Sequence, residues 1–369
     1  MTSSLSVLAL VPYALDTTPS QRFRLEQWAP GLERAGYRLE FSPYFDRSTT
    51  AILQRPGQRL SKMVGVLRGF RQRQRDLRRA GKQDLLVVHR AAVVAGPAAL
   101  DLAFLRLGVP AVFDFDDAIY LRNKSVNRLF DRLKFASKTA VLCRHSALVS
   151  AGSRYLAEWA RERSRAVVTV PTSIDTVRYT PRRPAEARVP VVVGWTGSAT
   201  TLPYLEGFAP ILRDLASCRS VQFRVVSNRA PVLPGLPVDW RPWSAATEVD
   251  EISAFDIGIK PLPDDPWTRG KCPMKELQYM ALQIPTVCSA VGASREAVRH
   301  GVTGFSVSSR QEWLRALISL IDSYELRREM GAAGRGVVER EYATAVSVRR
   351  FAEALGTIDR TPQAQGTAQ

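Results

Sequence analysis

A short stretch at the start of one predicted helix gathers charges that could bind a diphosphate. A strand-like run over residues 256–262 ends in a loop rich in proline, glycine and charge, and a helix is predicted over 273–282. The first N–H groups of a helix and its dipole favour anions, and basic side chains added there would complete a diphosphate site. The alternative is a solvated loop with surface lysines. The residues concerned are Arg269, Gly270, Lys271 and Lys275.

Carboxylates gather at the end of another predicted strand, Ala111–Phe115. Asp114, Asp116 and Asp117 stand almost side by side in the chain. Neighbouring carboxylates can raise one another's pKa and serve acid–base or cation-binding roles. Three interpretations stay open: a metal-binding pair of Asp114 and Asp116, orientation of a substrate hydroxyl, or a cap for the next helix. We favour the hydroxyl-orienting role for Asp116 or Asp117.

Alternating strands and helices must position these residues. Apolar runs of strand length are separated by helical patterns almost throughout the chain, which is typical of βαβ units and a parallel sheet. The pattern restarts after a proline-rich polar stretch at 171–190. We therefore predict two tandem doubly wound, Rossmann-like α/β domains at 1–175 and 185–356, with a ligand cleft between them, and a disordered tail at 357–369.

Charge is the unusual feature of the composition. The chain has 369 residues, 45% hydrophobic and 24% charged, which is ordinary for a globular protein, but its net charge is +17. Residues 1–180 hold 29 basic and 15 acidic side chains, against 23 and 20 in the remainder. We expect the anionic partner that this positive charge attracts to bind the N-terminal half of the chain.

The cysteines, histidines and N-terminus indicate the compartment. Four separated cysteines without a Cys-x-x-Cys pair, together with three histidines, argue against a disulfide framework and a zinc site. The N-terminus lacks the basic region of a signal peptide, and no apolar segment is long enough to span a membrane. A cytoplasmic location is expected.

The region around the helix at 273–282 resembles the donor-binding segment of retaining glycosyltransferases of family 4, which have the GT-B fold. Residues 277–287 match the family's Leu-Glu-Ala-Met-Ala-x-Gly-x-Pro-Val-Val pattern, residues 292–296 match its Gly-Gly-x-x-Glu turn, and residues 300–305 match its Asp-Gly-x-x-Gly-Phe segment. The similarity extends over about 190–345.

Two departures mark a divergent branch. The family's Glu-x7-Glu pair is replaced by Gly270 and Gln278, and the loop after the first strand of the C-terminal half lacks the family's basic residues. The resemblance implies that Gln278 replaces the carboxylate that contacts the donor ribose, and that Lys271 and Lys275 are catalytic through the leaving diphosphate. The expected donor-binding residues are Gly197, Ser198, Asn228, Trp243, Arg269, Met274 and Gln278.

The N-terminal half is expected to bind the acceptor. A second Rossmann-like domain argues against a GT-A metal site at the carboxylates, so Asp117 is predicted to be catalytic and Asp116 to bind the acceptor. The expected acceptor-binding residues also include Arg22 and Arg24, which follow the first strand and could bind anions, and His89, which ends another strand and could contact the acceptor. A lone histidine is more often structural than functional.

Residues 55–82 form a basic amphipathic pattern with ten Lys/Arg and one acid. An apolar stripe at helical spacing leaves most of the basic residues outside it. Such a helix is expected to lie on anionic lipid, and a core helix with a solvated basic face is weighed equally. Nucleic-acid binding is a weaker third alternative because aromatic residues are scarce there. The apolar residues are Leu60, Met63, Val64, Leu67 and Phe70.

The residues and the resemblance together imply a metal-independent, retaining glycosyltransferase that needs no cofactor beyond its nucleotide-sugar donor. Its acceptor would be a cell-envelope component, a lipid-linked molecule or a polysaccharide. The enzyme would lie in the cytoplasm or on the inner face of the plasma membrane. The alternatives are a GT-B nucleotide-sugar epimerase and a non-catalytic nucleic-acid-binding protein.

Overall fold

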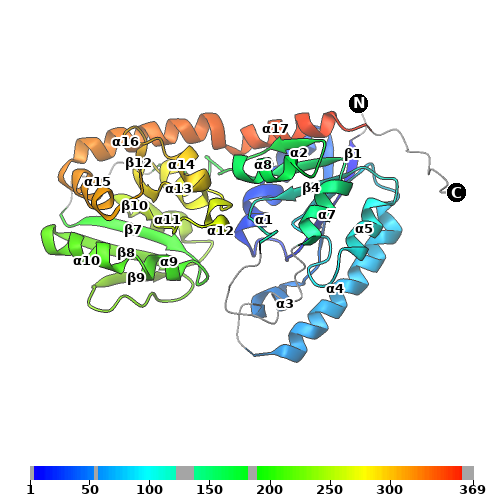
Figure 1. The fold of residues 1–369 in the computed structure, drawn as a ribbon, viewed down its shortest axis with the longest axis horizontal. Helices are drawn as coiled ribbons and strands as arrows, with labels where there is room; N and C mark the ends of the chain where they lie inside the picture. Colours follow the sequence, from blue (N-terminus) through cyan, green and yellow to red (C-terminus); the bar gives the residue numbers. More distant parts are fainter. Residues whose placement is uncertain (1–3, 54–56, 122–136, 182–188, 360–369) are drawn as a thin grey trace. The chain divides into compact units, whose positions relative to one another are not determined.

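The computed structural model divides the chain into two units, each built on a parallel six-stranded sheet (Figure 1). Unit 1 comprises residues 1–172 and 345–369, and unit 2 comprises residues 173–344. The structure describes residues 4–53, 57–121, 137–181 and 189–359. The predicted pair of Rossmann-like domains of GT-B type is confirmed.

The sheet of unit 1 has the strand order β2-β1-β3-β4-β5-β6. Its strands are β1 (Leu5–Val11), β2 (Tyr37–Pro43), β3 (Leu85–His89), β4 (Ala111–Phe115), β5 (Leu148–Ala151) and β6 (Val167–Thr169). The helices are α1 (Pro19–Gln21), the π-helix η1 (Arg22–Glu26), α2 (Gln27–Arg34), α3 (Arg47–Ile52), α4 (Arg59–Ala80), α5 (Ala99–Leu105), α7 (Ser137–His145), α8 (Arg154–Arg161) and α17 (Thr344–Gly356).

The sheet of unit 2 has the order β12-β11-β10-β7-β8-β9. Its strands are β7 (Val191–Gly197), β8 (Val221–Ser227), β9 (Val238–Pro242), β10 (Ile257–Lys260), β11 (Thr286–Ser289) and β12 (Gly304–Val307). The helices are α9 (Leu202–Glu206), α10 (Ala209–Cys218), α11 (Glu248–Ser253), α12 (Pro266–Arg269), α13 (Met274–Ala281), α14 (Gly292–Ala297), α15 (Arg310–Asp322), α16 (Tyr324–Val337) and the π-helix η2 (Val338–Tyr342).

Strand order identifies where each sheet should bind a ligand. In unit 2 the chain begins at β7, builds outward through β8 and β9, and then returns to the other side of β7 with β10. Ligands of open α/β sheets bind outside the carboxyl ends of the strands at this reversal. The corresponding reversal in unit 1 lies between β1 and β3. The side chains at these strand ends are therefore the candidates for contact with a ligand.

The C-terminal helix differs from the prediction that the second domain extends to residue 356. Residues from Ala345 onward belong to unit 1, where α17 packs beside α2 (Figure 1). The rings of Phe351 and Trp28 lie 5.4 Å apart, and Val348 and Leu355 share the core with Val7 of β1. The apolar face of α17 thus completes the core of unit 1. The predicted disordered tail at 357–369 lies largely outside the described residues, which end at Asp359.

Candidate active site

A lysine of α13 lies close to the glycine that ends β7 in unit 2. Trp195 is buried, and a Cβ on Gly197 would lie only 2.4 Å from its ring, so this position admits no side chain without displacing the ring. The Lys275 ammonium, from the first turn of α13, lies 5.2 Å from the centroid of the same ring. A cation over the face of tryptophan is attracted by the ring quadrupole. Trp195 therefore holds the charge of Lys275 close to the loop that begins at Gly197.

Ser198 and Asn228 organise that loop. The Asn228 Oδ1 accepts from the N–H of Ala199 at 2.7 Å, and the N–H of Ser198 donates to the Thr201 hydroxyl at 3.2 Å. The Ser198 and Thr200 hydroxyls are 2.7 Å apart. The predicted donor-binding residues Gly197, Ser198 and Asn228 are thus brought together at the adjoining ends of β7 and β8. The N–H groups of Ser198 and Ala199 are therefore already hydrogen-bonded within the loop. The positive charge that a diphosphate needs would come from the lysines.

The loop between α12 and α13 positions Lys271. Asp265 and Thr268 form a capping box at the start of α12, and the N–H of Lys271 donates to the Thr268 carbonyl at 3.1 Å. The Lys271 ammonium lies 5.4 Å from the ring centroid of Trp267. Both predicted catalytic lysines therefore lie against tryptophan rings, and both are only half-buried.

Arg269 and Met274 lie at the two ends of this loop. The exposed Arg269 guanidinium contacts the Asp264 carboxylate at 2.6 and 3.1 Å, so a predicted donor contact is already paired with an acid at the surface. Its backbone carbonyl packs against Gly292, where a Cβ would lie only 2.2 Å from that carbonyl oxygen, and the φ of +51° also disfavours a side chain. Met274 is half-buried at the first position of α13.

A buried ion pair beneath the lysines was not predicted from the sequence. The Lys260 ammonium, at the end of β10, lies 2.8 Å from a carboxylate oxygen of Glu276 and donates to the Ser294 hydroxyl at 3.1 Å and the Cys272 carbonyl at 3.2 Å. Both members of the pair are buried. Lys260 thereby joins the lysine-bearing loop and the starts of α13 and α14 to the sheet. The sequence signal was a lysine ending an otherwise apolar strand.

Gln278 lies in a second buried cluster with Glu248. Its amide nitrogen donates to the Tyr179 hydroxyl at 3.0 Å and to Glu248 at 3.1 Å, and Tyr179 donates to the other oxygen of Glu248 at 2.7 Å. The indole N–H of Trp243 also donates to Glu248, at 3.0 Å. The predicted donor residues Gln278 and Trp243 are therefore brought together by a carboxylate that sequence reasoning missed.

Unit 1 holds a buried polar chain at the carboxyl ends of β3 and β4. The Arg24 guanidinium grips both oxygens of Asp114, at 2.5 and 3.0 Å, and His89 Nδ1 lies 2.8 Å from one of them. All three side chains are fully buried. Burial alone would raise the pKa of Asp114, but the charge of Arg24 and the bond with His89 outweigh it and hold this pKa well below its usual value. Asp114 is therefore an ionised partner of Arg24.

Ser20 connects this chain to the buried Asp116, and Arg90 connects Asp116 to the half-buried Asp117. The Ser20 hydroxyl lies 3.2 Å from His89 Nε2 and donates to Asp116 at 2.6 Å. Arg90 donates to Asp116 at 3.1 Å and pairs with Asp117. Burial opposes ionisation of Asp116, yet Arg90 and its other cationic neighbours lower its pKa. Ser20 and Arg90 were missed from the sequence because neither stands in a recognisable motif.

The predicted acceptor residues thus divide into two kinds. Asp116, Asp117 and His89 are brought together as expected, although the His89 ring is fully buried with both nitrogens in contact with side chains. Arg24 does not present a free anion-binding group, because its guanidinium is buried against Asp114. Arg22 is also mostly buried, with its guanidinium 4.5 Å from the Phe23 ring centroid. These arginines support the fold around the site.

The metal-pair interpretation of Asp114 and Asp116 does not fit this geometry. Both oxygens of Asp114 are bound by Arg24 and His89, and Asp116 is held by Ser20 and Arg90. Within the described ranges, no group of three or more His, Cys, Asp or Glu side chains is arranged to hold a metal ion.

Comparison with known proteins supports a GT-B class of protein. Residues 267–337, which include Lys271, Lys275 and Gln278, match the family described as glycosyl transferases group 1. No curated protein matches the chain by sequence.

Solved structures resemble the whole chain. Anabaena HepE in complex with UDP and glucose is 15% identical, with a TM-score of 0.67 over 96% of this chain and 100% of HepE. Sucrose-phosphate synthase from Thermosynechococcus elongatus is 14% identical, with a TM-score of 0.70 over 96% and 98% of the two chains. A glycosyltransferase from Rickettsia africae is 12% identical, with a TM-score of 0.66 over 96% and 98%. At these identities the similarity establishes the fold.

Proposed function

We propose that this protein is a glycosyltransferase that uses a nucleotide-sugar donor, bound at the carboxyl ends of β7, β8 and β10 in unit 2. The observation that carries the proposal is the placement of Lys275 over Trp195, beside Gly197, at the reversal of strand order. This lysine and Lys271 lie inside the segment that matches glycosyl transferases group 1. Since HepE is described in complex with UDP-glucose, a UDP-sugar is the first donor to test.

The lysines supply the chemistry that a diphosphate leaving group needs. As the bond between the sugar's anomeric carbon and the diphosphate oxygen breaks, negative charge develops on that oxygen. Cations fixed in place before the reaction stabilise this charge without reorganisation. Lys271 and Lys275 would do so without a divalent cation, so the proposed enzyme is metal-independent, needs no further cofactor, and retains its rate in a chelator.

We further propose retention of configuration, as the resemblance to family 4 implies. The acceptor oxygen forms its bond to the anomeric carbon on the face that the diphosphate leaves, and the acceptor proton passes to the departing phosphate oxygen. The protein then has to orient the acceptor rather than supply a strong base. Asp117, at the accessible end of the polar chain in unit 1, is the proposed orienting group, with Asp116 beside it. A cytoplasmic enzyme with a lipid-linked or polysaccharide acceptor of the cell envelope fits this proposal.

Replacement of Lys275 tests the assignment. K275A should lower kcat/KM by about 100- to 1,000-fold, the usual loss when one preorganised charge donor is removed from an active site. K275M keeps most of the aliphatic contact with Trp195 and should lose as much, because the charge is what matters. R219A provides the control, since Arg219 pairs with Asp322 at the surface of unit 2, next to the amino end of β8 and away from the proposed site, and its rate should fall less than tenfold. Equal rates for K275A and the unaltered protein would refute the proposed role.

Product analysis separates the proposal from its rivals. A glycosyltransferase consumes donor in proportion to the glycosylated acceptor that forms, whereas an epimerase converts the nucleotide-sugar with no acceptor present. A nucleic-acid-binding protein would show strongly salt-dependent binding to DNA or RNA and no binding of nucleotide-sugars. The anomeric configuration of the product, measured by NMR, decides between retention and inversion.

A further inference from the structure

Helix α4 is fixed in one rotational orientation by tight contacts on its inner face. A Cβ on Gly65 would lie 2.3 Å from the Thr49 side chain, and one on Gly69 would lie 2.6 Å from the Tyr44 ring. These two glycines, one turn apart, allow the helix to approach α3 and the segment before it closely. The side of α4 that carries them must therefore face the protein.

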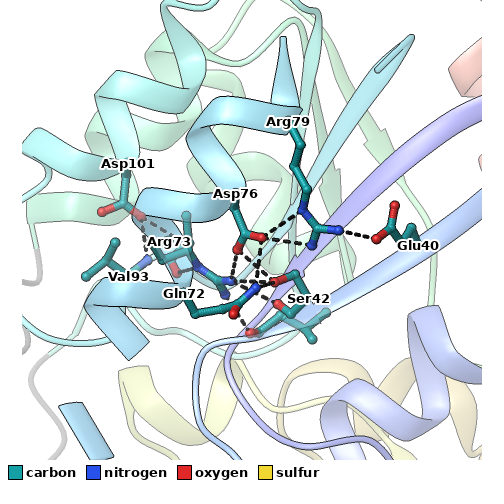
Figure 2. A network of polar contacts seen from close by, with 10 residues as sticks. Glu40, Ser42, Gln72, Arg73, Asp76, Arg79, Val93 and Asp101 are labelled. Carbon is teal, nitrogen blue, oxygen red and sulfur yellow. Dashed lines mark hydrogen bonds and ion pairs between the residues drawn. The ribbon is translucent and has the colours of Figure 1, made fainter. Parts of the chain in front are cut away.

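A buried polar network fixes the same face further along the helix (Figure 2). Arg73 is fully buried, donates to the carbonyls of Ser42, Val11 and Ala92 at 3.0, 2.9 and 2.5 Å, and pairs with Asp76 at 2.7 Å. Asp76 also binds Arg79, which reaches Glu40 (Figure 2). Lys62 and Arg73, two of the basic residues of this helix, are buried, so neither contact with lipid nor a solvated face applies to them.

The opposite face of α4 exposes four of the five residues of its apolar stripe, whereas Phe70 packs against Tyr44. Leu60, Met63, Val64 and Leu67 are 74%, 57%, 44% and 56% exposed. Their spacing of three and four residues places them on one side of the first two turns. The prediction of a core helix with a solvated basic face is therefore wrong for these four positions, since the stripe points away from the core.

Basic residues continue the same line along the helix. Arg71, Arg75 and Arg78 follow Leu67 at intervals of four, four and three residues, so they extend the apolar stripe on the outer face. All three are exposed, and in the part of the chain that the structure describes none of them has an ion-pair partner. The acid within α4, Asp76, is buried. The outer face thus changes from apolar to basic without an exposed acid.

We propose that the outer face of α4 docks on the surface of an anionic lipid bilayer. Apolar side chains on one side of a helix enter the boundary between headgroups and acyl chains, and basic residues beside them bind anionic headgroups. Leu60, Met63, Val64 and Leu67 would enter this boundary while Arg71, Arg75 and Arg78 contact lipid phosphates. None of the helices described in the structure is long and apolar enough to cross a membrane. The proposal concerns attachment to the surface and does not depend on the proposed glycosyltransferase activity.

Vesicle co-sedimentation tests the proposal directly. The full chain should bind vesicles of phosphatidylcholine containing about 30% phosphatidylglycerol and should bind pure phosphatidylcholine far more weakly. R71Q/R75Q/R78Q should weaken binding roughly 100-fold, because each basic residue near an anionic surface contributes about fivefold in affinity. L60S/M63S/L67S should weaken it at least about tenfold through lost apolar burial. Both variants alter exposed positions and should unfold at the temperature of the unaltered protein.

A matched variant controls for overall charge. R154Q/R161Q/R165Q removes three exposed arginines from unit 1 outside α4 and should retain most of the vesicle binding. Equal loss in this control would show that net charge, rather than α4, drives binding, and would overturn the proposal. Equal binding to neutral and anionic vesicles would overturn it as well. So would a dimer that L60S/M63S/L67S converts to a monomer, because a second copy would then cover the stripe.

Discussion

The pair of Arg24 and Asp114 shows why an arginine in a binding loop need not bind a ligand. The sequence predicts an anion-binding group after the first strand, but the guanidinium turns inward to a carboxylate at the end of β4. Removing one member of a buried ion pair leaves the other charge unpaired, which costs about 3–5 kcal/mol. These residues therefore have a structural role in the site: Asp114 positions His89, and His89 contacts Ser20.

Acid titration tests this assignment. Because the folded-state pKa of Asp114 is lowered, its carboxylate stabilises unit 1 fully at pH values above the ordinary pKa of about 3.9. That contribution is lost as the pH falls below this value toward the folded-state pKa. D114N should be less stable than the unaltered protein at pH 7, and the difference between them should shrink as the pH falls from 5 to 3. Urea unfolding at several pH values measures it, and a constant difference would contradict the pairing.

At the scale of elements, the sequence was enough to predict where strands end and to recognise the segment that resembles glycosyltransferases of family 4. It was not enough to predict which side chains meet across the fold. Lys271 and Lys275 belong to a recognisable local pattern, whereas Glu248 and Gln278 are 30 residues apart in the chain and are brought together only by the fold. Helix α4 illustrates a different limit. Periodicity predicts an apolar stripe on this helix but does not show whether the stripe faces the core. The signal for the core-facing side was the pair Gly65 and Gly69, which allow close packing. Similarly, nothing local in α17 indicates which unit its apolar face joins.

Glycine substitutions test the packing of α4. G69A should destabilise unit 1 by about 1–3 kcal/mol, because the new methyl group would force the Tyr44 ring to move. Gly81 ends the same helix with ordinary helical φ and ψ, and a methyl group added there would meet no atom within 4 Å, so G81A should be neutral or slightly stabilising. Chemical denaturation of both variants gives the comparison. A neutral G69A would mean that α4 is not held against the segment before α3.

At the scale of the whole molecule, the chain passes from unit 1 to unit 2 at residues 172 and 173 and returns at 344 and 345. Unit 1 is therefore complete only when the C-terminal helix is present. F351A should destabilise unit 1 by about 3–5 kcal/mol, since Phe351 is fully buried against Trp28. Hydrogen exchange should report faster opening of β1 and β3, while β7 and β10 keep their protection. Equal loss of protection in both sheets would show that the two units unfold as one.

Hydrogen exchange also tests the proposed donor site. UDP that binds only folded unit 2 should stabilise that unit by about 2.7 kcal/mol at a concentration about 100 times its Kd. Hydrogen exchange should therefore slow in β7, β10 and α13 and stay unchanged in β3 and β4. K275A should remove most of this protection, whereas D117N should leave it intact, since Asp117 belongs to unit 1 and is assigned to the acceptor. Protection that appears in unit 1 alone would reverse the proposed roles of the two units, because a ligand protects the unit that contacts it.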